Sequence, residues 1–195
     1  MKLSKRLIAI IVAVVVIGAW AASAYNSMVG EQEKATTALA NVQSAYQRRA
    51  DLIPNLVETV KGYASHEKET LEGVVNARSK ATQVTLDPEN MTPEKLQEFQ
   101  QAQGELGAAL GRLIAISESY PDLKANENFR DLQVQLEGTE NRINEARNSF
   151  NAAVQNYNVV IRSFPKNIFA GIFGFDKMTK FEAEAGAEKA PKVSF

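Results

Sequence analysis

The sequence predicts an all-α protein in which a single N-terminal membrane-spanning helix precedes four further helical segments. Two observations lead to this fold class. The chain opens with an uncharged apolar run, Leu7 to Ala24, and the remainder repeats apolar residues at steps of three and four, the spacing of one helical face. Prolines and polar clusters interrupt this spacing and delimit the segments.

The apolar run is long enough to cross a bilayer. At about 1.5 Å per residue it spans roughly 27 Å, close to the thickness of the hydrocarbon core. Trp20 and Tyr25 lie towards its far end, where aromatic side chains favour the membrane interface. A cleavable signal peptide is the alternative, because Ala22-Ser23-Ala24 resembles a processing site. The run exceeds the usual apolar region of such peptides, about 7–15 residues, which favours an anchor.

The charges flanking this run predict its orientation. Lys2, Lys5 and Arg6 precede it, whereas Glu31 and Glu33 follow it. Because positive flanks stay on the cytoplasmic side, we expect a cytoplasmic N-terminus, an external body and a single pass through the cytoplasmic membrane. Membrane lipid is therefore an expected partner.

The first helix is expected to continue from the membrane to about Arg49. Ile53-Pro54 then predicts a corner, because proline lacks an N–H donor and disfavours helical dihedrals in the residue before it. Asn55 and Glu58 have the spacing of a capping box, so we expect the second helix to run from about Asn55 to Ala81. The heptad-like, coiled-coil stripe of the first helix consists of Met28, Ala35, Leu39, Val42, Tyr46 and Arg49.

The third helix is expected to begin with Thr92 as its N-cap and Pro93 at its first position, and to end before Pro121. Beside its apolar seam runs a row of small residues. Each glycine inside a helix costs about 1 kcal/mol relative to alanine, so the row requires a compensating reason. We prefer close packing of a neighbouring helix, or of a second copy, over a ligand groove. The glycine row is Gly104, Ala108, Gly111 and Ala115.

The fourth helix, with Asn126 or Asn128 as its cap, carries the longest apolar seam, from Phe129 to Phe164. If every corner reverses the chain, this helix returns to the membrane and the aromatic segment after it lies at the bilayer surface around Lys166. Closing the end of the core is an equally weighted alternative. The aromatic segment comprises Phe164, Ile168, Phe169, Ile172, Phe173 and Phe175, and the tail after it, Asp176 to Phe195, is expected to be extended or disordered.

Several charged residues fall on or beside the apolar seams. Because a buried charge requires a partner, we expect interhelical polar pairing. A polar site within the bundle is the alternative. The uncharged Gln103 and Thr139 also fall on these seams, and the charged residues concerned are Arg49, Glu67, Arg78, Glu140 and Arg147.

The composition argues against several classes of chemistry. There is no cysteine, and His66 is the single histidine, so a site that requires two imidazoles is excluded. We expect His66 to be solvated. No glycine-rich phosphate loop, nucleophile elbow or paired-histidine zinc motif occurs. We therefore expect no catalytic residue, metal or cofactor. Outside the basic N-terminal flank, acids exceed bases, which argues against nucleic acid as a partner.

Long segments after the anchor resemble the LemA family. The resemblance implies a single N-terminal span and an antiparallel up-and-down four-helix bundle in bacterial and some archaeal membranes, without catalytic residues. It supports a division into residues 1–25 (basic tip and anchor), 26–165 (bundle) and 166–195 (aromatic segment and tail). The matching segments are Tyr25-Asn26, RRADLIPNLVETVKGYASHE, SYPDLKANENF, TENRINEAR, YNVVIRSFPKNIFA and GFDKMTKFEAEAGAEKAPKVSF.

These observations favour a non-catalytic, membrane-anchored helical scaffold that self-associates, as a homo-oligomer, or holds a protein partner at the membrane. The alternative is a binding module whose bundle interior or glycine row holds a small ligand or a partner peptide. An enzyme ranks third, because it would require a cluster of perturbed carboxylates in a cleft.

Overall fold

The structure is a computed structural model that describes residues 4–182. The part of the predicted tail at residues 183–195 lies outside the described residues. The described chain forms six α-helices and two short 3-10 helices, η1 and η2, and contains no strand. The prediction of an all-α protein is confirmed.

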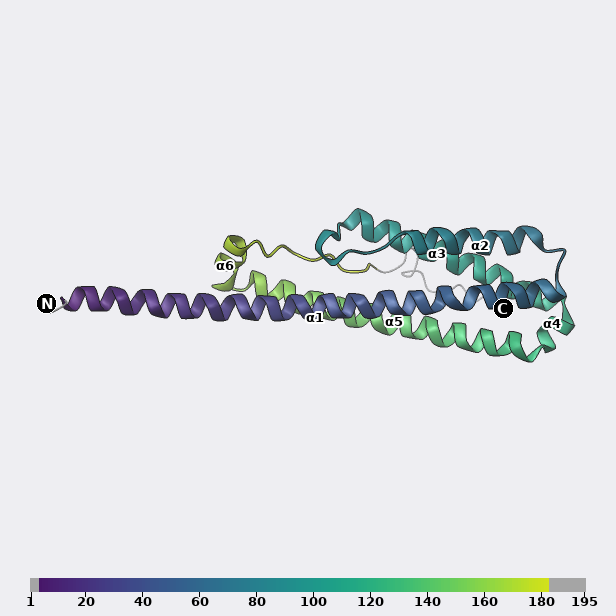
Figure 1. Ribbon diagram of the computed structural model, residues 1–195, viewed down its shortest axis with the longest axis horizontal. Helices are drawn as coiled ribbons and strands as arrows, with labels where there is room; N and C mark the ends of the chain where they lie inside the picture. The colour runs from purple at the N-terminus through teal and green to yellow at the C-terminus, as the bar shows by residue number, and fades with distance from the viewer. Residues whose placement is uncertain (1–3, 183–195) are drawn as a thin grey trace, which may run out of the picture.

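The longest element, α1 (Lys5–Tyr63), extends from the apolar run directly into the body, which we define as residues 26–182. Its N-terminal part projects beyond all other helices (Figure 1). Apolar side chains there, including Ile10 and Val14, are exposed. Among residues 4–182, α1 is the one helix long and apolar enough to cross a membrane.

The predicted corner at Pro54 is wrong, because α1 passes through Pro54 without interruption. Proline cannot donate the hydrogen bond that a helix normally supplies to the carbonyl four residues earlier, here that of Ala50. In the folded chain Arg78 Nε donates to the Ala50 oxygen at 2.8 Å. A side chain from another helix thus replaces the missing donor, and the helix continues.

The chain reverses at residues 64–67 instead, and α2 (Lys68–Gln83) is shorter than predicted. Asn55 and Glu58 therefore lie inside α1 and do not cap a helix. The Tyr120 hydroxyl donates to Glu67 Oε1 at 3.1 Å beside this turn. His66 lies in the turn and is exposed, as predicted.

The later boundaries follow the prolines and caps of the sequence. Thr92 Oγ1 accepts a hydrogen bond from the Lys95 N–H at the start of α3, and Asn126 Oδ1 accepts one from the Phe129 N–H at the start of α5, so both predicted N-caps are confirmed. The elements are η1 (Pro88–Asn90), α3 (Pro93–Ile116), η2 (Ser117–Ser119), α4 (Pro121–Ala125) and α5 (Glu127–Arg162).

Helices α1 and α5 lie side by side over much of their length (Figure 1). Polar contacts fix their register. The Tyr63 hydroxyl accepts from Asn126, Arg49 pairs with Glu140, and Ser27 accepts from Lys166 just beyond α5. The end of α5 therefore lies beside the part of α1 that follows the apolar run.

Three buried clusters follow one another along the body. One, near the turn after α1, includes Val60, Leu113 and Phe129. The middle cluster includes Val42, Phe99, Phe150 and Phe181, and the third, nearest the apolar run, includes Met28, Tyr157 and Ile161. The periodic seam of α5 contributes to all three, so α5 unites the core.

The chain ends its described part with α6 (Lys166–Phe173) and an extended segment, residues 174–182, which we call the strap. Gly174 adopts φ 75°, a left-handed conformation that glycine tolerates at a helix end. The strap then runs back along the body towards α3 (Figure 1). Phe181, near its end, is only 5% exposed.

Candidate functional site

An aromatic cluster joins α6 to the end of the apolar run. The Trp20 and Phe169 ring centroids lie 5.0 Å apart in edge-to-face geometry. Tyr25 makes similar contacts with Phe173 at 5.2 Å and with Phe175 at 5.6 Å. Lys166 Nζ donates to Ser27 Oγ at 2.9 Å and holds the first turn of α6 against α1. Residues distant in sequence thus form one aromatic surface.

The predicted aromatic segment divides between this cluster and solvent. Phe169 and Phe175 are partly buried and pack against the cluster of Met28 and Tyr157. The remaining four predicted residues are exposed, and these are Phe164, Ile168, Ile172 and Phe173. Phe164, with 81% of its surface exposed, is the most exposed of the four. The segment therefore partly closes the core and partly presents an apolar surface beside Trp20.

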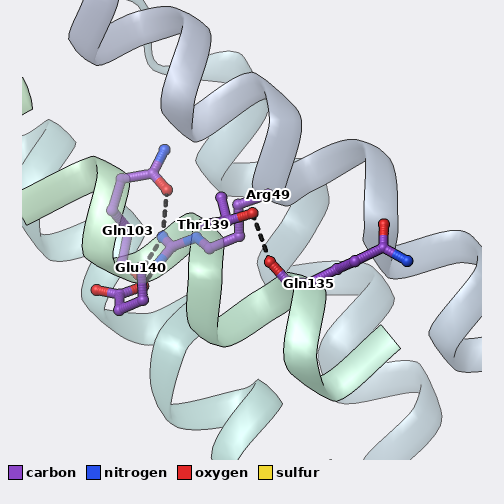
Figure 2. A network of polar contacts seen from close by, with 5 residues as sticks. All are labelled: Arg49, Gln103, Gln135, Thr139 and Glu140. Carbon is purple, nitrogen blue, oxygen red and sulfur yellow. Dashed lines mark hydrogen bonds and ion pairs between the residues drawn. The ribbon is translucent and has the colours of Figure 1, made fainter. Parts of the chain in front are cut away.

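A buried arginine connects three helices in the middle of the body. Figure 2 shows the Arg49 guanidinium of α1 between Gln103 of α3 and Glu140 of α5. Arg49 Nη1 lies 3.0 Å from Glu140 Oε2, and Nη2 donates to Gln103 Oε1 at 2.7 Å. Gln103 Nε2 in turn donates to the Ala81 carbonyl of α2. Since a buried charge is costly unless paired, this network fixes the register of the helices.

Thr139 lies beside this network, also buried, and its hydroxyl bonds to the Gln135 carbonyl of its own helix at 2.7 Å (Figure 2). The Arg49 guanidinium also lies 5.1 Å from the Tyr46 ring centroid. Arg49 Nε, however, is buried without a hydrogen-bond partner. The network is therefore not fully satisfied by the described chain.

The other residues predicted to pair form contacts outside this network. Arg78 Nε donates a hydrogen bond to the Ala50 carbonyl. Glu67 accepts a hydrogen bond from the Tyr120 hydroxyl, and this bond raises the pKa of Tyr120. Arg147 Nη2 donates to the Glu182 carbonyl, and its guanidinium lies over the Phe181 ring at 5.2 Å. Of the five charged residues predicted to pair, Arg49 and Glu140 form an ion pair with each other.

The glycine row faces open space and not a neighbouring helix of this chain. A Cβ atom built at Gly104, Gly107 or Gly111 meets no atom within 4 Å outside its local surroundings. The prediction that these glycines allow close approach of another helix is therefore wrong within the chain. Contact with a second copy stays a prediction.

The row instead lines a groove of about 430 Å³ between α3 and α5. Gly104, Gly107, Ala108 and Gly111 form its α3 wall, while Ala115, the last predicted residue of the row, does not line it. Three members of the Arg49 network, Arg49, Gln103 and Glu140, also line the groove. The other lining residues are Tyr46, Arg49, Gln100, Gln103, Leu110, Ile114, Gln133, Leu136, Glu137, Glu140 and Arg147.

Sequence reasoning missed the residues that hold the strap. Asn158 Nδ2 donates to the Met178 carbonyl at 2.9 Å, and its Oδ1 accepts from the Met178 N–H at 3.0 Å. Asn151 makes the same pair of hydrogen bonds with Phe181, both at 2.9 Å. The signal was two asparagines one heptad apart on α5, which place both amides on one helical face. The expectation of an extended tail holds for residues 176–182, but that segment is packed and bonded.

Within residues 4–182, no three His, Asp or Glu side chains gather as a metal site would require. The groove contains a paired arginine, amides and apolar side chains, which suit binding by hydrogen bonds and packing.

Comparison with known proteins adds a family assignment. The model of the LemA family matches residues 38–195. Magnetosome protein MamQ of Magnetospirillum gryphiswaldense is 29% identical over 180 residues, which cover 83% of this chain and 66% of that protein. Protein LemA of Metamycoplasma hominis is 26% identical over 144 residues, covering 74% of this chain and 59% of that protein. The matched residues thus span less than two thirds of the length of these relatives.

Proposed function

This chain belongs to the LemA family, and we propose that it is a single-pass membrane protein whose helical body acts at the membrane surface by self-association or by holding a protein partner, without catalysis. In this proposal α1, α2, α3 and α5 form an antiparallel four-helix bundle. The N-terminus is cytoplasmic, and the body lies outside the cytoplasmic membrane.

One observation carries the proposal: α1 continues from the apolar run into the body as a single helix. A flexible linker would let a body diffuse freely around its anchor, whereas a helix fixes both distance and direction. Such rigidity suits a protein that presents a surface at a set height above the bilayer. The Arg78 contact that maintains α1 through Pro54 supports the same idea, because it preserves this continuity.

The aromatic cluster supports contact of the body with lipid. Trp20 and Tyr25, at the end of the apolar run, pack against α6, whose Ile168 and Ile172 are exposed. Exposed apolar groups beside Lys166 match the pattern of a segment that lies in the interface. The aromatic segment would thus rest on the bilayer and restrict tilting of the body.

The test is affinity purification of the full chain from detergent-solubilised membranes, followed by mass determination of the intact complex. We expect a mass larger than one chain, from further copies or from a co-purifying protein. A monomer without any co-purifying protein at several mild detergent conditions would contradict the proposal.

The groove along the glycine row favours one second candidate, a binding module. Its volume of about 430 Å³ falls within the range of about 300–1,000 Å³ typical of ligand sites. If this candidate is correct, small molecules that co-purify with the protein should be released on denaturation and be identifiable by mass spectrometry. Filling the groove with Gly107→Leu should then abolish their retention.

A further inference from the structure

The contacts of α6 show how much of the apolar helix lies clear of the body. Figure 1 shows α6 beside α1, at the base of the projecting helix. The rings of Phe169 and Trp20 lie 5.0 Å apart, so α6 reaches back along α1 to the level of Trp20. Every residue from Ser4 to Trp20 is exposed, whereas Ala21 is partly buried and Ala24 is buried. In the described chain, the uncovered part of the apolar run therefore ends at about Trp20.

This uncovered part is too short to match the thickness of a bilayer by itself. From Leu7 to Trp20 the helix is about 21 Å long, at about 1.5 Å per residue. The hydrocarbon core is about 30 Å thick, so a body whose end rested on the headgroups at Trp20 would leave a shortfall of about 9 Å. The complete run from Leu7 to Ala24 spans about 27 Å and nearly removes this mismatch. The last turn of the run, together with the groups packed on it, then lies in hydrocarbon.

The surface of α6 suits such an environment. The two polar residues of α6, Lys166 and Asn167, both lie in its first turn. Lys166 Nζ donates to Ser27 Oγ, about 10 Å farther along α1 than Trp20, so its charge lies on the headgroup side. Four apolar side chains in and next to α6 are exposed, and these are Phe164, Ile168, Ile172 and Phe173.

We propose that α6 is embedded in the acyl layer of the leaflet nearest the body, beside the last turn of the apolar run, and that its exposed side chains bind lipid acyl chains. This inference rests on the proposed membrane anchor and deepens it, because α6 then contributes to the hydrophobic thickness of the protein. One helix crosses the leaflet farther from the body, whereas two helices occupy the nearer leaflet.

Lipid is favoured over a protein partner because the surface of α6 is continuous with the anchor. Tyr25 contacts both Phe173 and Phe175, at 5.2 Å and 5.6 Å between ring centroids, and Trp20 contacts Phe169. These rings join α6 to a helix that lies in lipid under the proposed function. Acyl chains around the anchor are therefore the nearest apolar groups for the exposed side chains of α6.

Depth-resolved fluorescence quenching in vesicles tests the inference. Trp20 is the single tryptophan, so its emission reports the level of the α1–α6 contact without any substitution. A dye on Gly171→Cys reports α6, because the natural sequence contains no cysteine and a Cβ built at Gly171 meets no atom within 4 Å. The full chain is reconstituted in phosphatidylcholine vesicles with quenchers on the headgroups, or with bromines in the upper or lower part of the acyl chains. We expect the largest loss of emission at both positions with bromines in the upper part.

Two further dye positions separate this inference from the proposed anchor. Val14→Cys lies near the middle of the apolar run and should be quenched most by the deepest bromines, whereas Gly138→Cys, an exposed position of α5, should not be quenched. If Val14→Cys behaves so but Gly171→Cys is quenched from the headgroups alone, the inference is overturned, the anchor stands and the bilayer thins around the protein. If no quencher reaches Gly171→Cys, the inference is overturned in favour of a protein-covered α6. Absence of quenching at Val14→Cys would overturn the anchor as well.

A second measurement tests the side chains that bind lipid. Replacing both Ile168 and Ile172 by serine removes apolar surface at exposed positions, so the dye on Gly171→Cys should move towards the headgroups. Replacing Val75 and Val134, two exposed valines of the body, by serine is the matched control and should leave the depth of the dye unchanged. Equal depths in the two variants would contradict the claim that Ile168 and Ile172 bind acyl chains.

Discussion

The continuity of α1 through Pro54 depends on a donor from another helix, and this dependence can be measured. The Ala50 residue is 3% exposed, so its carbonyl has little access to water, and Arg78 Nε donates to it at 2.8 Å. Replacing Arg78 by methionine keeps much of the side-chain volume but removes the donor. A buried carbonyl left without a partner costs about 1–3 kcal/mol, and we expect the free energy of unfolding to fall by that amount.

A second substitution makes the test specific. Pro54→Ala restores an N–H that can bond to the Ala50 carbonyl within α1, and Pro54 is exposed, so its removal opens no cavity. In the Pro54→Ala background, Arg78→Met should therefore cost less than in the natural background. We expect a coupling free energy of about 1 kcal/mol or more between the two positions.

The assay is denaturant unfolding of the full chain in detergent micelles, followed by circular dichroism, for the four members of the double-mutant cycle. Arg142→Met, which removes an exposed arginine from α5, controls for the loss of a surface charge. A coupling free energy within about 0.3 kcal/mol of zero would refute the argument, since independent sites are additive to that extent. It would mean that Arg78 does not substitute for the missing proline donor.

Four further predictions concern the orientation of the chain, the aromatic segment, the strap and the glycine row. Protease added to spheroplasts should digest the body, because the basic N-terminal flank favours a cytoplasmic N-terminus; full protection of a body that is cleavable after lysis would contradict this orientation. An environment-sensitive dye on Gly171→Cys should be quenched by lipid-borne quenchers in reconstituted vesicles, whereas the same dye on Gly138→Cys should not. Quenchers that leave the emission at position 171 as unchanged as at position 138 would refute membrane contact of α6. Asn158→Ala removes both hydrogen bonds to Met178, so proteases should cleave the strap faster and the free energy of unfolding should fall by about 1–2 kcal/mol. Asn148→Ala, at an exposed position of the same helix, is the control. Equal cleavage rates and equal free energies of unfolding in the two variants would contradict this prediction. Finally, Gly111→Leu should not lower the melting temperature of the monomer, because a Cβ built at Gly111 meets no neighbour and leucine favours the helix more than glycine does. A lower melting temperature of the isolated monomer would show that the glycine row packs against another part of the chain.

Much of the fold is predictable from the sequence because it depends on local chemistry. The apolar run before Tyr25 forms an exposed helical segment, and the seam of α5 is continuous from its Asn126 cap, because periodicity and capping act within a few residues. Thr92 and Pro93 likewise begin α3 at the predicted position. Such signals require no knowledge of neighbouring helices.

The candidate sites were only partly predictable. The aromatic segment, Arg49, Glu140 and Gln103 were identified as residues, but not which residues they contact: the sequence did not indicate that Arg49 pairs with Glu140 or that Trp20 and Tyr25 pack against the aromatic segment. The glycine row was identified as unusual, but the expectation that a neighbouring helix of the same chain packs against it is wrong. A periodic pattern indicates which face of a helix carries small residues, but not whether another helix covers that face.

The sequence by itself determined the membrane-length apolar helix, the all-α class, the caps of α3 and α5, and the lack of cysteine chemistry. The tertiary structure alone decided three features: that α1 passes through Pro54, that the glycine row lines a groove, and that Asn151 and Asn158 hold the strap. Each depends on a contact between residues far apart in sequence. The physical reason is that local rules describe which backbone groups lack a partner, whereas only the packed chain supplies the partner, as Arg78 does for Ala50.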